Sequence, residues 1–171
     1  FKTIPPLSIP AQARKELLRR ELALSQNDNR PIALVSLGGI PANSIPIAAL
    51  AEDERFHWLL DIPIPTNLQH KTHLHLSTKI LNWNFRDLSA SVDGIVSKPG
   101  YGMAVASAMD GVPFLYVRRK IFPDEEPVGR WLDRHGRGAE LDKQKFDSGD
   151  WADPLLRLME KPLPAKPDFG G

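Results

Sequence analysis

The chain of 171 residues is 42% hydrophobic and 25% charged, and its formal net charge is +1. These values fit one globular domain and predict no strong attraction to nucleic acid or to acidic lipid. The sequence has no cysteine, which excludes disulfides, thiolate nucleophiles and cysteine-based zinc sites and suits a reducing cytosol.

No apolar run reaches the roughly 18 residues that a membrane helix needs. The sequence begins at Phe1 and has no signal-peptide pattern. We therefore expect a cytoplasmic chain that is a fragment or a processed form of a longer protein.

The predicted helices and strands alternate along the chain. Leu17, Leu18 and Leu24 give the first helix an apolar stripe, and the continuous apolar run at 32–37 is typical of a strand buried on both faces. In chain order we predict a helix at 11–24, a strand at 32–37, a helix at 44–52 with Ser44 as its N-cap, strands at 56–61, 72–76 and 91–97, a helix at 101–109, a strand at 112–117, a helix at 125–135, a strand at 139–141 and a helix at 151–160.

This alternation predicts an α/β fold: a mostly parallel sheet with helices on both faces. We expect one domain over residues 1–160, followed by a Pro/Gly-rich tail at 161–171. In such sheets the ligand binds beyond the carboxyl ends of the strands.

Two predicted strands end in glycines. After the strand at 91–97 come Lys98, Gly100, Tyr101 and Gly102, and then a helix. The N–H groups and dipole of that helix, with Lys98, could bind a diphosphate that the glycines allow to approach. A tight turn without a ligand is equally compatible with this spacing. The same two alternatives apply to Gly38 and Gly39 after the strand at 32–37.

Charged residues follow the strand at 112–117. Arg118 and Arg119 come first, and Asp124, Glu125 and Glu126 precede the next helix. Asp124 could cap that helix, with the two glutamates favoured by its dipole. Alternatively, a carboxylate could bind sugar hydroxyls while one arginine faces a phosphate.

Histidines give no comparable prediction. His73 and His75 would share one face of a strand, and His70 is near. No third ligand pattern accompanies them, so we expect no metal site.

The order of these motifs resembles the C-terminal domain of GT-B glycosyltransferases. The residues concerned are Val35–Gly39, Ser97–Gly102, Gly111–Arg119, Glu125 with Glu126, and Gly136–Gly138. The sequence is similar to the group of the bacterial lipid II-forming N-acetylglucosaminyltransferase and, more closely, to the glycosyltransferase-like region of plant arabinokinases. The resemblance runs from about residue 11 to residue 151.

This resemblance implies one Rossmann-like half of a GT-B fold that binds a nucleoside-diphosphate sugar, with UDP-sugar as the favoured donor and no further cofactor. The glycine loop would bind the diphosphate, residues 81–85, including Trp83, Asn84 and Phe85, would line the base, and Glu125 and Glu126 would lie near the sugar. The acceptor and the catalytic base would belong to an N-terminal domain absent from this sequence. Peripheral membrane association of the full-length protein is left open.

The sequence departs from the family pattern at the residues that would bind the ribose. Relatives have a threonine and then a glutamate after the glycine loop, where this chain has Met103 and Ala106. Loss of a charged hydrogen bond costs roughly 1.5–3 kcal/mol. The alternatives to a glycosyltransferase are therefore a non-catalytic sugar-nucleotide-binding or scaffold domain with a degenerate site, and a GT-B-fold UDP-sugar epimerase.

Overall fold

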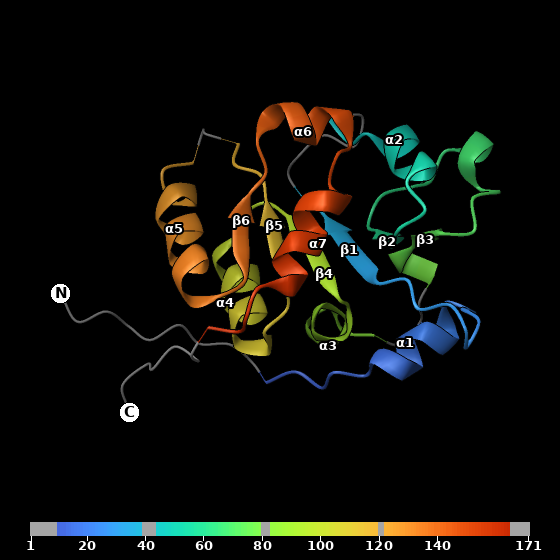
Figure 1. Cartoon of the computed structure of the whole chain (residues 1–171), viewed down its shortest axis with the longest axis horizontal. Coiled ribbons are helices and arrows are strands. Elements are labelled where there is room, and N and C mark those ends of the chain that lie inside the picture. Colours follow the sequence, from blue (N-terminus) through green and yellow to red (C-terminus); the bar gives the residue numbers. More distant parts are fainter. Residues whose placement is uncertain (1–9, 39–43, 80–82, 120–121, 165–171) are drawn as a thin grey trace.

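The computed structural model describes residues 10–38, 44–79, 83–119 and 122–164 (Figure 1). Within these residues, six parallel strands form one sheet in the order β3-β2-β1-β4-β5-β6. The strands are β1 (Ile32–Ser36), β2 (His57–Leu60), β3 (Leu74–Leu76), β4 (Gly94–Ser97), β5 (Phe114–Tyr116) and β6 (Gly138–Glu140).

Helices follow the strands in sequence and cover both faces of the sheet. They are α1 (Lys15–Glu21), α2 (Ile47–Glu52), α3 (Phe85–Ser91), α4 (Tyr101–Asp110), α5 (Glu125–His135), α6 (Lys143–Ser148) and α7 (Ala152–Glu160), with the short 3-10 turns η2 (Thr66–Leu68) and η3 (Ser77–Lys79). No helix in the described part of the chain is long and apolar enough to cross a membrane.

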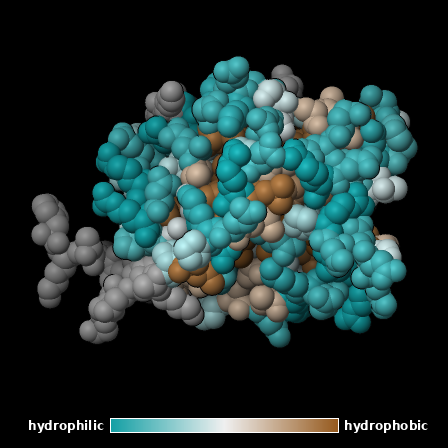
Figure 2. All heavy atoms as spheres, in the orientation of Figure 1, coloured by the Kyte–Doolittle hydropathy of each residue, from teal (hydrophilic) through white to brown (hydrophobic). Residues whose placement is uncertain are grey.

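Two hydrophobic clusters lie on opposite faces of the sheet because side chains alternate along each strand. In β1, Ala33 and Val35 join the cluster under α2, α6 and α7. Ile32 and Leu34 join the cluster under α1, α3, α4 and α5. Figure 1 shows α7 crossing the sheet, and Figure 2 shows a mostly hydrophilic surface on the same side, with hydrophobic atoms emerging mainly near α7.

The predicted α/β architecture with helices on both faces is confirmed. The predicted helix at 125–135 has the bounds of α5, and β1 lies within the predicted strand at 32–37. The first four residues of β1 are buried, as expected for a strand covered on both faces.

The predicted strand at 91–97 is wrong in its first half. Ser91 is the last residue of α3, and β4 begins only at Gly94. The side chain of Asn84 accepts the backbone N–H of Asp87 at 2.8 Å and thereby caps α3.

One expectation about a helix end is wrong, and a further helix is absent from the predicted elements. Pro46, not Ser44, is the N-cap of α2, which has no side-chain cap. Helix α6 was not predicted, although Asp142 caps it and Gly149, at a φ of 75°, ends it in the left-handed conformation that favours glycine.

Candidate functional site

The carboxyl ends of β1 and β4 lie side by side at the centre of the sheet. The chain moves from β1 outward to β2 and β3, and from β4 outward to β5 and β6. This strand order is that of a doubly wound sheet, in which ligands bind at the point where the order reverses. Because Ser36 of β1 is the register partner of Ser97 of β4, the structure brings the loop with Gly38 next to the loop with Lys98.

The loop after β4 leads directly into α4. Gly100 is the N-cap of this helix of ten residues and has no side-chain cap hydrogen bond. The first N–H groups of a helix lack partners within the helix, and the helix dipole adds about half a positive charge there. Tyr101, the first residue of α4, is 53% exposed, so this helix end is open to solvent.

Lys98 adds a full positive charge to the same place. Its Nζ atom lies 3.7 Å from the position that a Cβ on Gly100 would occupy. Among the described residues Lys98 makes no ion pair. A Cβ on Gly38 or Gly102 would meet no atom within 4 Å. The backbone here is therefore accessible, and its charge suits an anion such as a diphosphate. Gly39 lies outside the described residues.

The predicted arginines after β5 are already paired. Arg118 forms a two-atom ion pair with Glu140, with Nε and Nη2 each 2.8 Å from a carboxylate oxygen. Arg119 donates its backbone N–H and its Nε to the carboxylate of Glu125, at 2.7 and 2.6 Å. An incoming phosphate would have to compete with these carboxylates for either guanidinium.

Glu125 and Glu126 differ sharply despite being neighbours. The side chain of Glu125 is 3% exposed, whereas that of Glu126 is 57% exposed and pairs with Arg130 one helical turn away. Asp124 is the N-cap residue of α5, but its side chain accepts no capping hydrogen bond, so only the position of the predicted cap is confirmed. The carboxylate of Glu125 instead fixes the loop between β5 and α5.

The segment expected to line the base is only partly described, since residues 81 and 82 lie outside the described ranges. Asn84 uses its side chain to cap α3, and Phe85, the first residue of α3, is 50% exposed. The indole of Trp83 donates to Glu21, and the guanidinium carbon of Arg14 lies 4.2 Å from the centre of its ring. One face of Trp83 is thus already occupied by a cation–π contact.

The departures from the family's ribose contacts lie on α4. Ala106 is buried, and Met103 packs against the second hydrophobic cluster. Neither side chain offers a carboxylate or a hydroxyl. In this structure both residues contribute to packing rather than to a polar site.

The structure shows one polar group at the strand ends that the sequence did not suggest. Asp61, directly after β2, accepts the hydroxyl of Ser36 at 2.8 Å, while Ser97 donates to the backbone oxygen of Ser36. The Oδ1 atom of Asp61 is buried and accepts no hydrogen bond within the described residues. The signal in the sequence that could have indicated Asp61 is its place directly after a buried strand. That strand neighbours β1, which leads to Gly38.

Histidines do not converge as a metal site. His73 bonds to the backbone oxygen of Leu50, whereas His75 contacts the ring of His57, so they do not share one environment. The part of the chain that the structure describes contains no group of three or more His, Asp or Glu side chains that could hold a metal ion.

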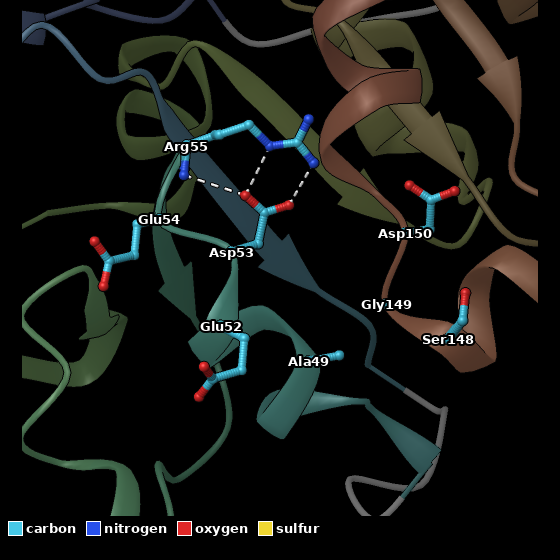
Figure 3. A pocket seen from close by; sticks show the side chains of 8 residues that line it. All are labelled: Ala49, Glu52, Asp53, Glu54, Arg55, Ser148, Gly149 and Asp150. Carbon is cyan, nitrogen blue, oxygen red and sulfur yellow. Dashed lines mark hydrogen bonds and ion pairs between the residues drawn. The ribbon is translucent and has the colours of Figure 1, made fainter.

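A depression of about 650 Å³ opens between α2 and the turn that joins α6 to α7 (Figure 3). Figure 3 shows its Asp53 carboxylate bonded to the guanidinium of Arg55. The lining residues are Ala49, Glu52, Asp53, Glu54, Arg55, Ser148, Gly149 and Asp150. Four carboxylates against one guanidinium repel a diphosphate, so this depression is not a candidate for the donor site.

The sequence matches no protein-family model and no curated protein. The fold, in contrast, is similar to solved glycosyltransferases of the GT-B class. The glycosyltransferase of kitacinnamycin has a TM-score of 0.61 and 17% identity, and the match covers 81% of this chain and 37% of that chain. The calicheamicin glycosyltransferase CalG4 has a TM-score of 0.54 and 20% identity, with coverages of 77% and 35%.

The spinosyn rhamnosyltransferase SpnG, solved with thymidine diphosphate, has a TM-score of 0.57 and 17% identity, and the match covers 78% of this chain and 38% of that chain. This chain thus spans well under half the length of these solved proteins. Its architecture is α/β and Rossmann-like, matching one half of a GT-B glycosyltransferase.

Proposed function

We propose that this chain is the donor-binding domain of a glycosyltransferase that uses a nucleoside-diphosphate sugar. The observation that supports this proposal is the convergence of Lys98, the open N-terminus of α4 and the accessible backbone at Gly38 and Gly102 where the strand order reverses. These groups present positive charge and backbone donors to one small region, which is what a diphosphate requires.

In this proposal the same groups assist the reaction. Transfer of a sugar breaks the bond between its anomeric carbon and the diphosphate, so negative charge grows on the leaving diphosphate. Lys98 and the α4 N–H groups stabilise that charge more strongly as it develops, which lowers the barrier. The acceptor and the base that deprotonates it would come from an N-terminal domain.

The finer identity of the donor is part of the proposal. We favour a UDP-sugar because of the resemblance to the lipid II-forming and arabinokinase groups. Two structurally similar glycosyltransferases, SpnG and VinC, were solved with thymidine diphosphate. Thymidine and uridine bases share the same hydrogen-bonding edge, so both diphosphates belong in the test.

A second candidate function is a non-catalytic domain that binds sugar nucleotides weakly or acts as a scaffold. Ala106 is buried and Met103 packs on the core at the two positions where relatives bind the ribose. Without those two polar contacts, affinity rests on the diphosphate.

Calorimetric titration of this chain with UDP, thymidine diphosphate, ADP and GDP, and with UDP-sugars and thymidine-diphosphate sugars, tests the proposal. We expect binding of the pyrimidine diphosphates at micromolar to millimolar levels. Absence of binding of every nucleotide at millimolar concentration would contradict it. Binding of a diphosphate together with failure of every sugar nucleotide would favour the scaffold.

A further inference from the structure

A second pocket, of about 340 Å³, lies between the end of α1 and the edge strand β3. Its apolar side chains come from the end of α1, the loop after β2 and β3, and its polar side chains are Glu21, Gln69 and His75; polar and apolar surface contribute about equally to the wall. It shares no residue with the loop after β4, so its ligand preference is independent of the proposed donor site. A pocket of this size with a few convergent polar groups is typical of small-molecule sites.

A chain of hydrogen bonds determines what His75 offers this pocket. Asp28 is held by the guanidinium of Arg30, which keeps the pKa of the Asp28 carboxyl well below its usual range. The ionised carboxylate can only accept, so the Nε2 atom of His57, 2.9 Å away, must carry the proton that it donates. Burial lowers the pKa of His57, so its ring is neutral near pH 7 and its Nδ1 atom accepts.

The Nε2 atom of His75 lies 3.0 Å from that Nδ1 atom and is therefore the donor. Burial lowers the pKa of His75 to about 4, so this ring is also neutral near pH 7. Its Nδ1 atom consequently has a free lone pair. His75 presents a hydrogen-bond acceptor of fixed tautomer.

The other two polar groups are acceptors as well. The Nε2 group of Gln69 donates to the backbone oxygen of Ile64 at 3.4 Å, which leaves its Oε1 atom to accept. One carboxylate oxygen of Glu21 accepts from the indole of Trp83, and its other oxygen adds acceptor capacity and negative charge. Each of the three polar side chains thus offers an acceptor, Gln69 keeps one further N–H, and the Glu21 carboxylate gives the pocket one negative charge.

We propose that this pocket binds a small organic amine. Its ammonium would donate to Glu21, Gln69 and the Nδ1 atom of His75, while its apolar body would pack on Leu22, Ile64 and Leu76. A carboxylate or phosphate is disfavoured because it would meet the negative charge of Glu21 and the acceptor on His75. A neutral alcohol would satisfy some acceptors and would leave the charge of Glu21 uncompensated.

Three probes of the same shape test this proposal: benzylamine, benzyl alcohol and benzoate, each titrated at millimolar levels into ¹⁵N-labelled protein. We expect benzylamine to shift the amide signals of Leu22, Ile64 and Leu76, benzyl alcohol to bind more weakly, and benzoate to leave them unchanged. Equal binding of benzoate and benzylamine, or the absence of shifts at these residues with benzylamine, would overturn the proposal.

Substitution of Glu21, the charged residue of the pocket, provides a second test. Glu21→Gln should weaken benzylamine binding about tenfold, as expected for loss of a charged hydrogen bond. Glu16→Gln, on the same helix but outside the pocket, should leave it unchanged. Equal affinities of the two variants would overturn the role of Glu21.

A separate NMR experiment tests the tautomers of His57 and His75. Long-range ¹H–¹⁵N NMR spectra should show both His57 and His75 as the tautomer protonated at Nε2. A His75 ring protonated at Nδ1 would contradict its role as an acceptor, whichever probe binds.

Discussion

The Nε atom of Arg119 lies 2.6 Å from the Oε1 atom of Glu125, and the backbone N–H of Arg119 lies 2.7 Å from the other carboxylate oxygen. The two residues are six positions apart in the sequence, and the segment between them leads from β5 into α5. The guanidinium of Arg119 also lies over the ring of Phe122, 3.8 Å from its centre. Glu125 therefore has a structural role. If its carboxylate also contacted a bound donor, the same group would have to serve both roles.

Removal of Glu125 should therefore destabilise the fold. Glu125→Ala leaves the guanidinium and the N–H of Arg119 without their acceptor in a part-buried site, and we expect a loss of about 2–4 kcal/mol. Glu126→Ala removes only an exposed ion pair within one helix and should cost less than about 0.5 kcal/mol. Urea denaturation of both variants measures the difference, and equal stabilities would contradict the structural role of Glu125.

Gly129 in α5 should not tolerate a methyl group. A Cβ there would lie 2.8 Å from the hydroxyl oxygen of the buried Tyr116, and this hydroxyl donates to Asp133 at 3.1 Å. Overpacking of this kind costs about 1–3 kcal/mol and outweighs the roughly 1 kcal/mol that alanine gains in a helix. We expect a net loss in Gly129→Ala by thermal or urea denaturation. A gain in stability would show that Tyr116 can move aside freely.

Gly102 in α4 should respond in the opposite way. No atom lies within 4 Å of a Cβ built at this position, so Gly102→Ala should leave stability unchanged or raise it by up to about 1 kcal/mol. The added methyl group would occupy the space proposed for the diphosphate. We expect weaker nucleotide binding in a protein that is at least as stable, measured by calorimetry beside denaturation. Unchanged nucleotide affinity would place the diphosphate elsewhere.

The half-buried His75 should make stability depend on pH. The pKa of His75 is lowered from 6.5 to about 4, first by burial and then by the charges of His57, His73 and Arg30, with Asp28 acting in the opposite sense. Between these pH values the unfolded chain binds a proton that the folded chain does not. Stability is therefore fully present above pH 6.5 and is lost as pH falls toward 4, by up to about 3 kcal/mol.

His75→Gln should flatten this part of the stability profile, measured by urea denaturation at about pH 4.5, 5.5 and 7. His70→Gln, at an exposed histidine, should keep the wild-type slope. If His75→Gln also kept that slope, His75 would not remain neutral in the folded protein.

Much of the fold follows from patterns that are local in the sequence. The alternation of strands and helices predicted the parallel sheet, and the loops with Gly38 and Lys98 follow the carboxyl ends of its two central strands. Helix α3 is absent from the predicted elements, although Asn84 and Asp87 have the spacing of an N-cap pair.

The site was harder to predict than the fold because its contacts join distant residues. The pairing of Arg119 with Glu125 spans a loop and has no periodic signature in the sequence. The approach of Arg118 to Glu140 depends on β5 and β6 being neighbours. The chain from Asp28 through His57 to His75 likewise depends on β2 and β3 being neighbours.

The most direct test of the central claim is the dissociation constant for UDP of the unchanged chain and of Lys98→Met. Lys98 is the cation beside the open end of α4, and its loss should weaken binding about tenfold to a hundredfold. Lys143→Met, at an exposed lysine paired with Asp147, serves as the matched control and should bind as the unchanged chain does. Equal affinities of all three proteins, or no binding of UDP or thymidine diphosphate to the unchanged chain, would contradict the assignment of this loop as a nucleotide-sugar site.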